Sequence, residues 1–376
     1  MTFRKAIGKL HLWLGLASGL VVLVVSLSGA VFVFQDEIRD LTQPWRHVAV
    51  QAQPMLPPSV LQATATQAKP GFTASWTTYN GPDRSVAVYL SKPGSEEVYY
   101  AFLNPYSGRL LQVQSLRRDF FTLVQYLHMY LLLPPAVGKW VVDVAVIIFV
   151  VMLVSGLVLW WPKNKAARKQ RFTVKWDASP KRRTYDLHST FGFYASALAL
   201  VLALSGLCIS YEWLMEGISK AVNGGRTIAA ETPVLQADTL LAPRAARPVV
   251  DVAYAHLRQQ SPQAEMLLIG PAGKGLATVW CTAYAKSLHY YHRDDYQFHP
   301  RTGQLLRAQL HAGKSPGKKL GDLNYDLHTG QILGFGSKVI AFVVSLISAS
   351  LPVTGFLVWR GRHNRKPRQR PALAAV

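Results

Sequence analysis

The sequence predicts a helical membrane protein with four transmembrane helices, arranged as two parallel repeats of span, external domain and span. The two external domains are expected to be α+β. Four long stretches are apolar and nearly free of charge, and each has the about 20 residues that a helix needs to cross a bilayer. The same short motifs also recur in the same order in the two halves of the chain. The apolar stretches are Leu12–Phe34, Trp140–Trp161, Ser189–Trp213 and Val339–Trp359.

The positions of lysine and arginine predict the orientation of these spans. The N-terminus, the connection between the second and third spans, and the tail hold three, nine and six basic residues, against only Asp177 and Asp186. By the positive-inside rule, both termini and this connection are cytoplasmic, and the two longer connections are external. The first span is longer than the apolar core of a signal peptide, so we interpret it as retained. The predicted segments are 1–35 (cytoplasmic N-terminus and first span), 36–138 (first external domain), 139–161 (second span), 162–187 (basic cytoplasmic loop), 188–213 (third span), 214–336 (second external domain), 337–359 (fourth span) and 360–376 (basic cytoplasmic tail).

The net charge of +21 does not indicate a nucleic-acid partner. The positive charge is concentrated in the segments where membrane topology requires it, and attraction to anionic lipid head groups explains it more simply. The two cysteines provide no disulfide framework, because Cys208 lies in the third span and Cys281 in an external domain. We therefore expect the lipid bilayer, and no nucleic acid, among the partners.

Matched motifs define the internal repeat. Leu10-His11-x-x-x-Gly15 matches Leu187-His188-x-x-x-Gly192, and a Ser-Gly pair follows each histidine at the same distance. A unit with two spans starts and finishes on the same side, so the copies are parallel and related by a pseudo-twofold axis along the membrane normal. We interpret the Ser-Gly and Thr-Gly pairs as helix-packing devices. The other matched motifs are Ser28-Gly29 with Ser205-Gly206, Pro105-Tyr-Ser-Gly108 with Pro300-Arg-Thr-Gly303, Leu127-His128 with Leu327-His328, and Ser155-Gly156 with Thr354-Gly355.

The external segments show helical patterning followed by alternating apolar runs. The Pro-x-Ser/Thr-Gly motif predicts a tight turn between strands, because proline restricts φ and glycine permits a positive φ. We interpret this motif as architecture rather than chemistry. The predicted helices are 57–69 and 249–260, and the predicted strands are 85–90, 98–102, 276–282 and 290–298.

Four of the eleven histidines occupy repeat-related positions at the ends of spans. His11 corresponds to His188 on the cytoplasmic side, and His128 corresponds to His328 on the external side. A twofold axis between matched side chains can place two imidazoles on opposite faces of one planar cofactor. The segment 120–133 is expected to form a short surface helix carrying His128, and the glycine-rich surroundings of His328 predict a less regular segment.

Haem fits this pattern best, because its iron takes axial imidazole ligands and its macrocycle needs an apolar slot between helices. We expect two b-type haems, one held by His11 and His188 and the other by His128 and His328. Zinc would need further ligands, and covalent attachment would need a Cys-x-x-Cys-His motif. Gly15 and Gly192 lie on the same helix face as the preceding histidine, so they either admit the porphyrin or allow close helix packing.

These features resemble the PepSY-associated transmembrane family of iron-regulated inner-membrane proteins, and in particular its ferrisiderophore reductases. The resemblance rests on the two Leu-His-x-x-x-Gly motifs, the external domains with their turns, and the Leu-His motifs before the even-numbered spans. It implies PepSY-like periplasmic domains, the bacterial inner membrane, haem ligation at the four histidines, and reduction of a periplasmic Fe(III)-siderophore of ferrioxamine type. No Gly-x-Gly-x-x-Gly motif follows a strand, so the electron donor is expected to be another protein, a flavin or a quinol.

Two other classes of function compete with this interpretation. The external domains could bind or regulate another envelope protein, with the spans as anchors, but the symmetric histidines would then have no role. A transporter built on parallel repeats is less well supported, because four spans are few and their interiors are expected to lack charged residues and helix-breaking prolines. Aromatic residues of the external strands could form a docking surface for a siderophore, and His289, His292 and His299 could contact its iron. These aromatic residues are Trp76, Tyr99, Tyr100, Tyr106, Tyr290, Tyr291 and Tyr296.

Overall fold

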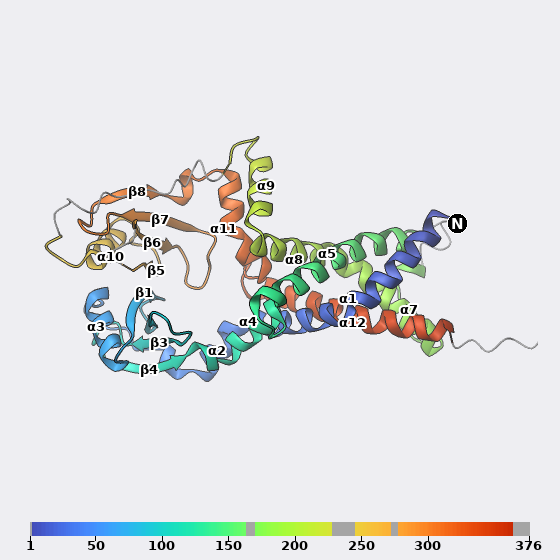
Figure 1. The fold of residues 1–376 in the computed structure, drawn as a ribbon, viewed down its shortest axis with the longest axis horizontal. Coiled ribbons are helices and arrows are strands. Elements are labelled where there is room, and N and C mark those ends of the chain that lie inside the picture. Colours follow the sequence, from blue (N-terminus) through green and yellow to red (C-terminus); the bar gives the residue numbers. More distant parts are fainter. Residues whose placement is uncertain (1, 163–169, 228–244, 272–276, 364–376) are drawn as a thin grey trace, which may run out of the picture. The chain divides into compact units, whose positions relative to one another are not determined.

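The structure is a computed structural model that describes residues 2–162, 170–227, 245–271 and 277–363. It divides into two compact units (Figure 1). The first unit comprises Met1–Val31, Gln125–Leu204 and Val339–Val376, and the second comprises Phe32–Val124 and Ser205–Lys338. Parts of the predicted basic loop (163–169) and of the basic tail (364–376) lie outside the described residues.

Four of the described helices are long and apolar enough to cross a membrane, so the prediction of a multi-pass membrane protein is confirmed. The helices run past the predicted apolar stretches because their backbone hydrogen bonds continue through flanking polar residues, and two of them begin at a proline that favours the first helical position. The third span combines two α-helices with a π-helical turn, Leu187–Phe191. The spans are α1 (Phe3–Val33), α5 (Pro135–Trp160), α7 (Pro180–Asp186) with α8 (Gly192–Ser210), and α12 (Phe335–His363).

Small residues let these helices approach closely in the first unit. Ala195 and Ala199 of α8 are almost fully buried against Leu153 of α5 and Val344 of α12. A bilayer offers no hydrophobic driving force between helices, so this close packing is what holds the spans together.

The expectation that the span interiors lack charged residues is wrong for α5, whereas the proline inside α12 does not break that helix. Asp143 lies buried within α5, where Lys139 one turn earlier neutralises it at 2.6 Å. Pro352 lies inside α12, which continues through it, and Gly19 of α1 packs against the proline ring. The ion pair with Lys139 offsets the free-energy cost of burying the Asp143 charge, and Gly19 leaves room for the ring of Pro352.

The second unit contains an eight-stranded sheet in the order β4-β3-β2-β1-β5-β6-β7-β8 (Figure 1). The strands that the sequence assigns to two separate external domains therefore share one sheet. The antiparallel pairing of β1 with β5 joins them, with Thr78 opposite Leu268. This pairing satisfies backbone groups that would otherwise form two exposed sheet edges. The strands are β1 (Thr73–Tyr79), β2 (Val86–Ser91), β3 (Val98–Leu103), β4 (Leu110–Ser115), β5 (Met266–Ile269), β6 (Val279–Tyr284), β7 (Arg293–Phe298) and β8 (Leu305–Gln309).

Two helices, α3 (Pro58–Ala68) and α10 (Val249–Gln260), cover one face of this sheet and lie within two residues of their predicted bounds. Ser59 of α3 donates to Asp251 of α10 at 2.6 Å, which ties the helices of the two halves together. Alternate residues of each strand point into the core beneath them, among them the fully buried Cys281. Cys281 and Cys208 are both free thiols, as the sequence predicts.

The predicted turns are present, with Gly108 at φ 70° and Gly303 at φ 72°. A positive φ is a conformation that glycine adopts without the steric cost that a Cβ brings. The structure also contains shorter elements around the sheet and spans: α2 (Gln35–Thr42), α9 (Glu212–Val222) and the 3₁₀ turns Pro44–Arg46, Leu116–Arg118 and His311–Gly313.

The helix predicted around His128 is confirmed as α4 (Phe120–Tyr130). The prediction for His328 is wrong, because this residue is the last of a regular helix, α11 (Pro316–His328). Ser315 caps the start of α11 by accepting from the Lys318 amide, and Gly330, with φ 74°, follows its end. The glycines thus terminate the helix and do not prevent it.

Candidate cofactor site

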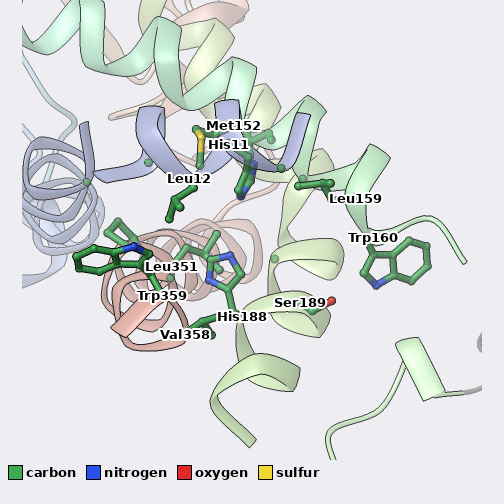
Figure 2. A pocket seen from close by; sticks show the side chains of 18 of the residues that line it. His11, Leu12, Met152, Leu159, Trp160, His188, Ser189, Leu351, Val358 and Trp359 are labelled. Atoms are coloured by element: carbon green, nitrogen blue, oxygen red, sulfur yellow. The ribbon is translucent and has the colours of Figure 1, made fainter. Parts of the chain in front are cut away.

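The structure brings together the two histidines predicted for the inner haem. His11 projects from α1 and His188 from the π-helical turn, and both rings point into the space between the helices (Figure 2). Their ring centroids lie 6.4 Å apart, with the ring planes at 89°. A π-helical turn is rare and often marks a functional position, and here it carries one of the two candidate ligands.

These rings line a cavity of about 660 Å³ in the first unit. Its volume falls within the range of small-molecule and cofactor sites, about 300–1,000 Å³. The walls are mainly aliphatic and aromatic, and all four spans contribute to them. Representative wall residues, several of them labelled in Figure 2, are Leu12, Met152, Leu159, Leu351, Val358 and Trp359.

The cavity lies where the basic ends of the spans meet. Arg4, near the start of α1, donates to the carbonyl oxygens of Leu159 and Trp161 at the end of α5, the latter at 3.0 Å. Arg171 and Arg362 also line the cavity. The start of α1 and the end of α5 therefore lie at the same end of the first unit, as the positive-inside argument requires of two consecutive spans.

Each inner histidine contacts a hydroxyl group and a glycine on a different span. His11 Nδ1 lies 2.8 Å from Ser155 Oγ, and a Cβ on Gly156 would lie 3.4 Å from the His11 ring. His188 Nδ1 lies 3.0 Å from Thr354 Oγ1, and a Cβ on Gly355 would lie 3.2 Å from its ring. The sequence pattern favours helix packing as the role of these Ser-Gly and Thr-Gly pairs and does not reveal their contact with the histidines.

The outer histidines have equivalent surroundings, each within its own unit. In the first unit, His128 Nδ1 lies 2.9 Å from the Val25 carbonyl oxygen and 3.3 Å from Ser28 Oγ. In the second unit, His328 Nδ1 lies 3.0 Å from Ser205 Oγ. A Cβ on Gly29 or on Gly206 would lie 3.0 or 2.9 Å from the neighbouring histidine ring. The pairing of His128 with His328 on one haem stays a prediction from the sequence repeat.

Gly15 and Gly192 both line the cavity, but their nearest neighbours are side chains of other helices. A Cβ on Gly15 would lie 2.7 Å from Met152 Cε, and one on Gly192 would lie 3.4 Å from Leu351. Of the two roles that the sequence left open, these contacts match close helix packing. Direct contact with a porphyrin would require the flexible Met152 side chain to move away from Gly15.

The geometry and donor set suit an iron porphyrin better than a structural metal ion. A metal–imidazole bond measures about 2 Å and a ring centroid lies about 1 Å beyond its nitrogen, so one metal ion held by both rings would need their centroids within about 6 Å of each other. The observed 6.4 Å agrees with this spacing. Among the described residues, no cluster of three or more His, Cys, Asp or Glu side chains could hold a metal ion by itself. Two imidazoles in a largely apolar cavity fit an axially ligated haem, whose macrocycle supplies the remaining ligands.

Comparison with known proteins agrees with this architecture. A family model described as the PepSY-associated TM region matches residues 9–362. The chain belongs to this family. As a PepSY-associated membrane protein, it combines apolar spans with an external region built around a sheet, and the match includes all four candidate histidines. No curated protein matches the chain.

Several residues that the sequence suggested for siderophore contact have structural roles in this PepSY-associated protein. Tyr106 and Tyr296 are buried in the second unit, and the Tyr106 hydroxyl donates to the Pro82 carbonyl oxygen at 2.7 Å. His299 is also buried, and its Nδ1 accepts from the amides of Arg301 and Thr302 in the predicted turn. These residues therefore stabilise the fold and present no common docking face.

Proposed function

We propose that this PepSY-associated protein is a di-haem b reductase of the inner membrane. It would pass electrons from the cytoplasmic side to an Fe(III)-siderophore in the periplasm and release Fe(II) for iron acquisition. The substrate class, a siderophore of ferrioxamine type, comes from the resemblance to ferrisiderophore reductases. The parallel repeat of the sequence is the basis for a second haem, for which His128 and His328 are the predicted ligands.

One observation carries the proposal: two imidazoles from different spans lie 6.4 Å apart, at right angles, in a largely apolar cavity of about 660 Å³. The histidines are far apart in the chain, so their approach results from the packing of the spans. An ordinary interfacial histidine faces the head groups or packs alone. A facing pair in an apolar cavity is the arrangement expected for axial ligation.

The residues around the cavity would hold the cofactor and keep water from it. His11 and His188 would hold it through their ring nitrogens, and a bound haem would supply a centre that gains and loses one electron at a time. Trp160 of α5 stacks on Phe193 of α8 at 3.6 Å between ring centroids and forms part of the wall at the basic end. Apolar walls lower the local dielectric and thereby affect the reduction potential of any bound centre.

The overall reaction needs an external donor. A quinol or reduced flavin would give up two electrons and two protons on the cytoplasmic side. Two ferric chelates would each accept one electron on the periplasmic side, which yields two Fe(II) ions. Outer-sphere electron transfer breaks no covalent bond, so it needs no acid or base side chain. The described residues that the reaction would use are therefore the two histidines and the residues of the cavity wall.

The test begins with the protein purified in mild detergent from haem-replete cells. We expect a sharp low-spin b-type α band after reduction with dithionite, about two haems per chain by pyridine haemochrome, and reoxidation by a ferric hydroxamate siderophore. His11→Ala and His188→Ala should each remove the same haem, whereas His47→Ala, at a partly exposed position in the second unit, should remove none. A colourless protein that does not take up added haem would refute the proposal.

A further inference from the structure

A hydroxyl residue followed by glycine accompanies each of the four candidate histidines. Ser155-Gly156 meets His11, Thr354-Gly355 meets His188, Ser28-Gly29 meets His128, and Ser205-Gly206 meets His328. In every case the hydroxyl lies 2.8 to 3.3 Å from Nδ1, and the glycine lies against the Cε1 edge of the ring. Helix packing alone would not place the same two groups on the same two ring atoms four times.

The direction of these hydrogen bonds follows from the other contacts of the hydroxyls. A serine or threonine hydroxyl has one hydrogen, and within a helix it is commonly donated to a carbonyl three or four residues earlier. Ser155 Oγ donates in this way to Met152 O at 3.2 Å, and Thr354 Oγ1 donates to Ser350 O at 2.9 Å. Each hydroxyl must then accept from its histidine, so the ring hydrogen is on Nδ1.

His128 supports this direction independently. Its Nδ1 lies 2.9 Å from the carbonyl oxygen of Val25, which can only accept a hydrogen bond. Ser28 Oγ, beside it, donates to the Val24 carbonyl oxygen at 2.8 Å. His128 Nδ1 must therefore carry a hydrogen, and the remaining nitrogen, Nε2, holds the lone pair that an iron ligand requires.

The glycine of each pair gives the ring the room to lie in this orientation. At Gly355 and Gly156 a Cβ would stand 3.2 and 3.4 Å from the Cε1 atom of the neighbouring histidine, the carbon between its two nitrogens. A larger side chain would push this edge away and break the bond from Nδ1 to the hydroxyl. Hydroxyl and glycine thus act together on one ring.

We infer that the Ser/Thr-Gly pairs are positioning elements for the four histidines: the hydroxyl holds each ring as the Nδ1–H tautomer, and the glycine admits it with Nε2 directed to the cofactor. This inference rests on the proposed function and deepens it. Ligating histidines in metal sites almost always donate their second nitrogen to an acceptor, which orients the ring and adjusts its basicity. A neutral hydroxyl is a weaker acceptor than a carboxylate, so the imidazole is expected to remain a neutral ligand.

The test compares three substitutions in the full chain, with haem retention as the readout. Ser155→Ala removes the acceptor and should accelerate loss of the His11/His188 haem to an apomyoglobin trap by about 10- to 100-fold. Ser155→Thr introduces the residue type found at the repeat-related position Thr354, so its rate of haem loss should stay within about twofold of the wild-type rate. Ser196→Ala is the matched control and should leave the rate of haem loss unchanged: this buried serine of α8 donates to Phe193 O at 2.7 Å and is not among the described residues that line the cavity.

A second readout separates positioning from a general loss of structure. Electron paramagnetic resonance of the oxidised protein should show altered low-spin g values for one haem in Ser155→Ala and unaltered values in Ser155→Thr. Unchanged retention and spectra in Ser155→Ala, with haem lost in His11→Ala, would overturn the inference and leave the proposed function intact. Haem retained in both His11→Ala and His188→Ala would instead refute the proposed function.

Discussion

Lys314 offers the sharpest test of how the sheet supports α11, the helix that ends at His328. Its ammonium group is fully buried and lies 2.8 Å from Asp295 of β7 and 2.7 Å from Asp322 of α11. It also donates to the carbonyl oxygen of Arg293 at 2.9 Å. Lys314→Met keeps an unbranched side chain that is one atom shorter and removes the charge, so it should weaken the attachment of α11 to β7.

The magnitude follows from what remains after the substitution. Breaking a buried ion pair usually costs about 3–5 kcal/mol, because the partner charge is left uncompensated. Asp322 would retain Arg293 at 2.9 Å and Lys318 at 3.2 Å, and Asp295 would retain Thr282 at 3.1 Å. The loss should therefore be near the lower limit, about 3 kcal/mol. At about 2–4 °C per kcal/mol for a unit of this size, the Tm should fall by about 6–12 °C.

The buried thiol of Cys281 provides the assay. In a Cys208→Ala background, a fluorogenic maleimide reacts with Cys281 only when the core of the sheet opens, so heating with the dye reports unfolding of the second unit. Lys319→Met, one residue beyond Lys318 on α11, is the control, because its ammonium group is exposed. A Tm within about 2 °C of the wild type, or an equal fall in the control, would refute the reasoning.

Two further predictions concern single positions. Burial raises the pKa of the Cys281 thiol from 9.0 to about 12, so in the folded protein at pH 8 the reactive thiolate should be about a thousandfold rarer than for an ordinary thiol. Iodoacetamide should therefore leave Cys281 unmodified under conditions that fully modify the urea-unfolded chain. Equal rates of modification in the folded and unfolded chains would contradict this prediction. Gly138→Ala should lower the Tm measured by far-ultraviolet circular dichroism, which reports the helices of both units, or prevent folding, because its Cβ would overlap the Tyr130 carbonyl and lie 2.7 Å from the Tyr130 Cα. Gly217→Ala, in open space on α9, should be neutral or stabilising by up to about 1 kcal/mol in the same measurement, and similar behaviour of the two variants would show that the close approach at Gly138 is not required.

Some features of this protein depend on local pattern alone, and these were predictable. Crossing a bilayer requires about 20 apolar residues in one run, so the spans are evident without knowledge of their packing. The bounds of α10 follow from Pro248 before its first residue and from its helical periodicity. The turn at Gly303 follows from the motif that begins with Pro300, because φ preferences belong to the residues themselves.

Other features depend on which segments meet, and the sequence pattern could not supply them. The pairing of β1 with β5 is a contact between strands almost two hundred residues apart. β1 is largely polar and β5 is only four residues long, so neither strand gave a clear alternating pattern. The prediction of an irregular segment at His328 was wrong because it rested on the number of glycines nearby. The segment is helical because Ser315 caps its start and the glycine after His328 ends it.

For the candidate site, the sequence by itself determined which residues correspond between the two halves. The repeat identified four histidines and, at the same spacing, their Ser-Gly and Thr-Gly partners, but spacing along a chain cannot show that Ser155 faces His11. Only the tertiary structure decided that, because it places α1 beside α5 and brings a hydroxyl within 2.8 Å of the ring. It also placed His11 and His188 opposite each other across one apolar cavity, since the orientation of a side chain between spans depends on how the helices pack.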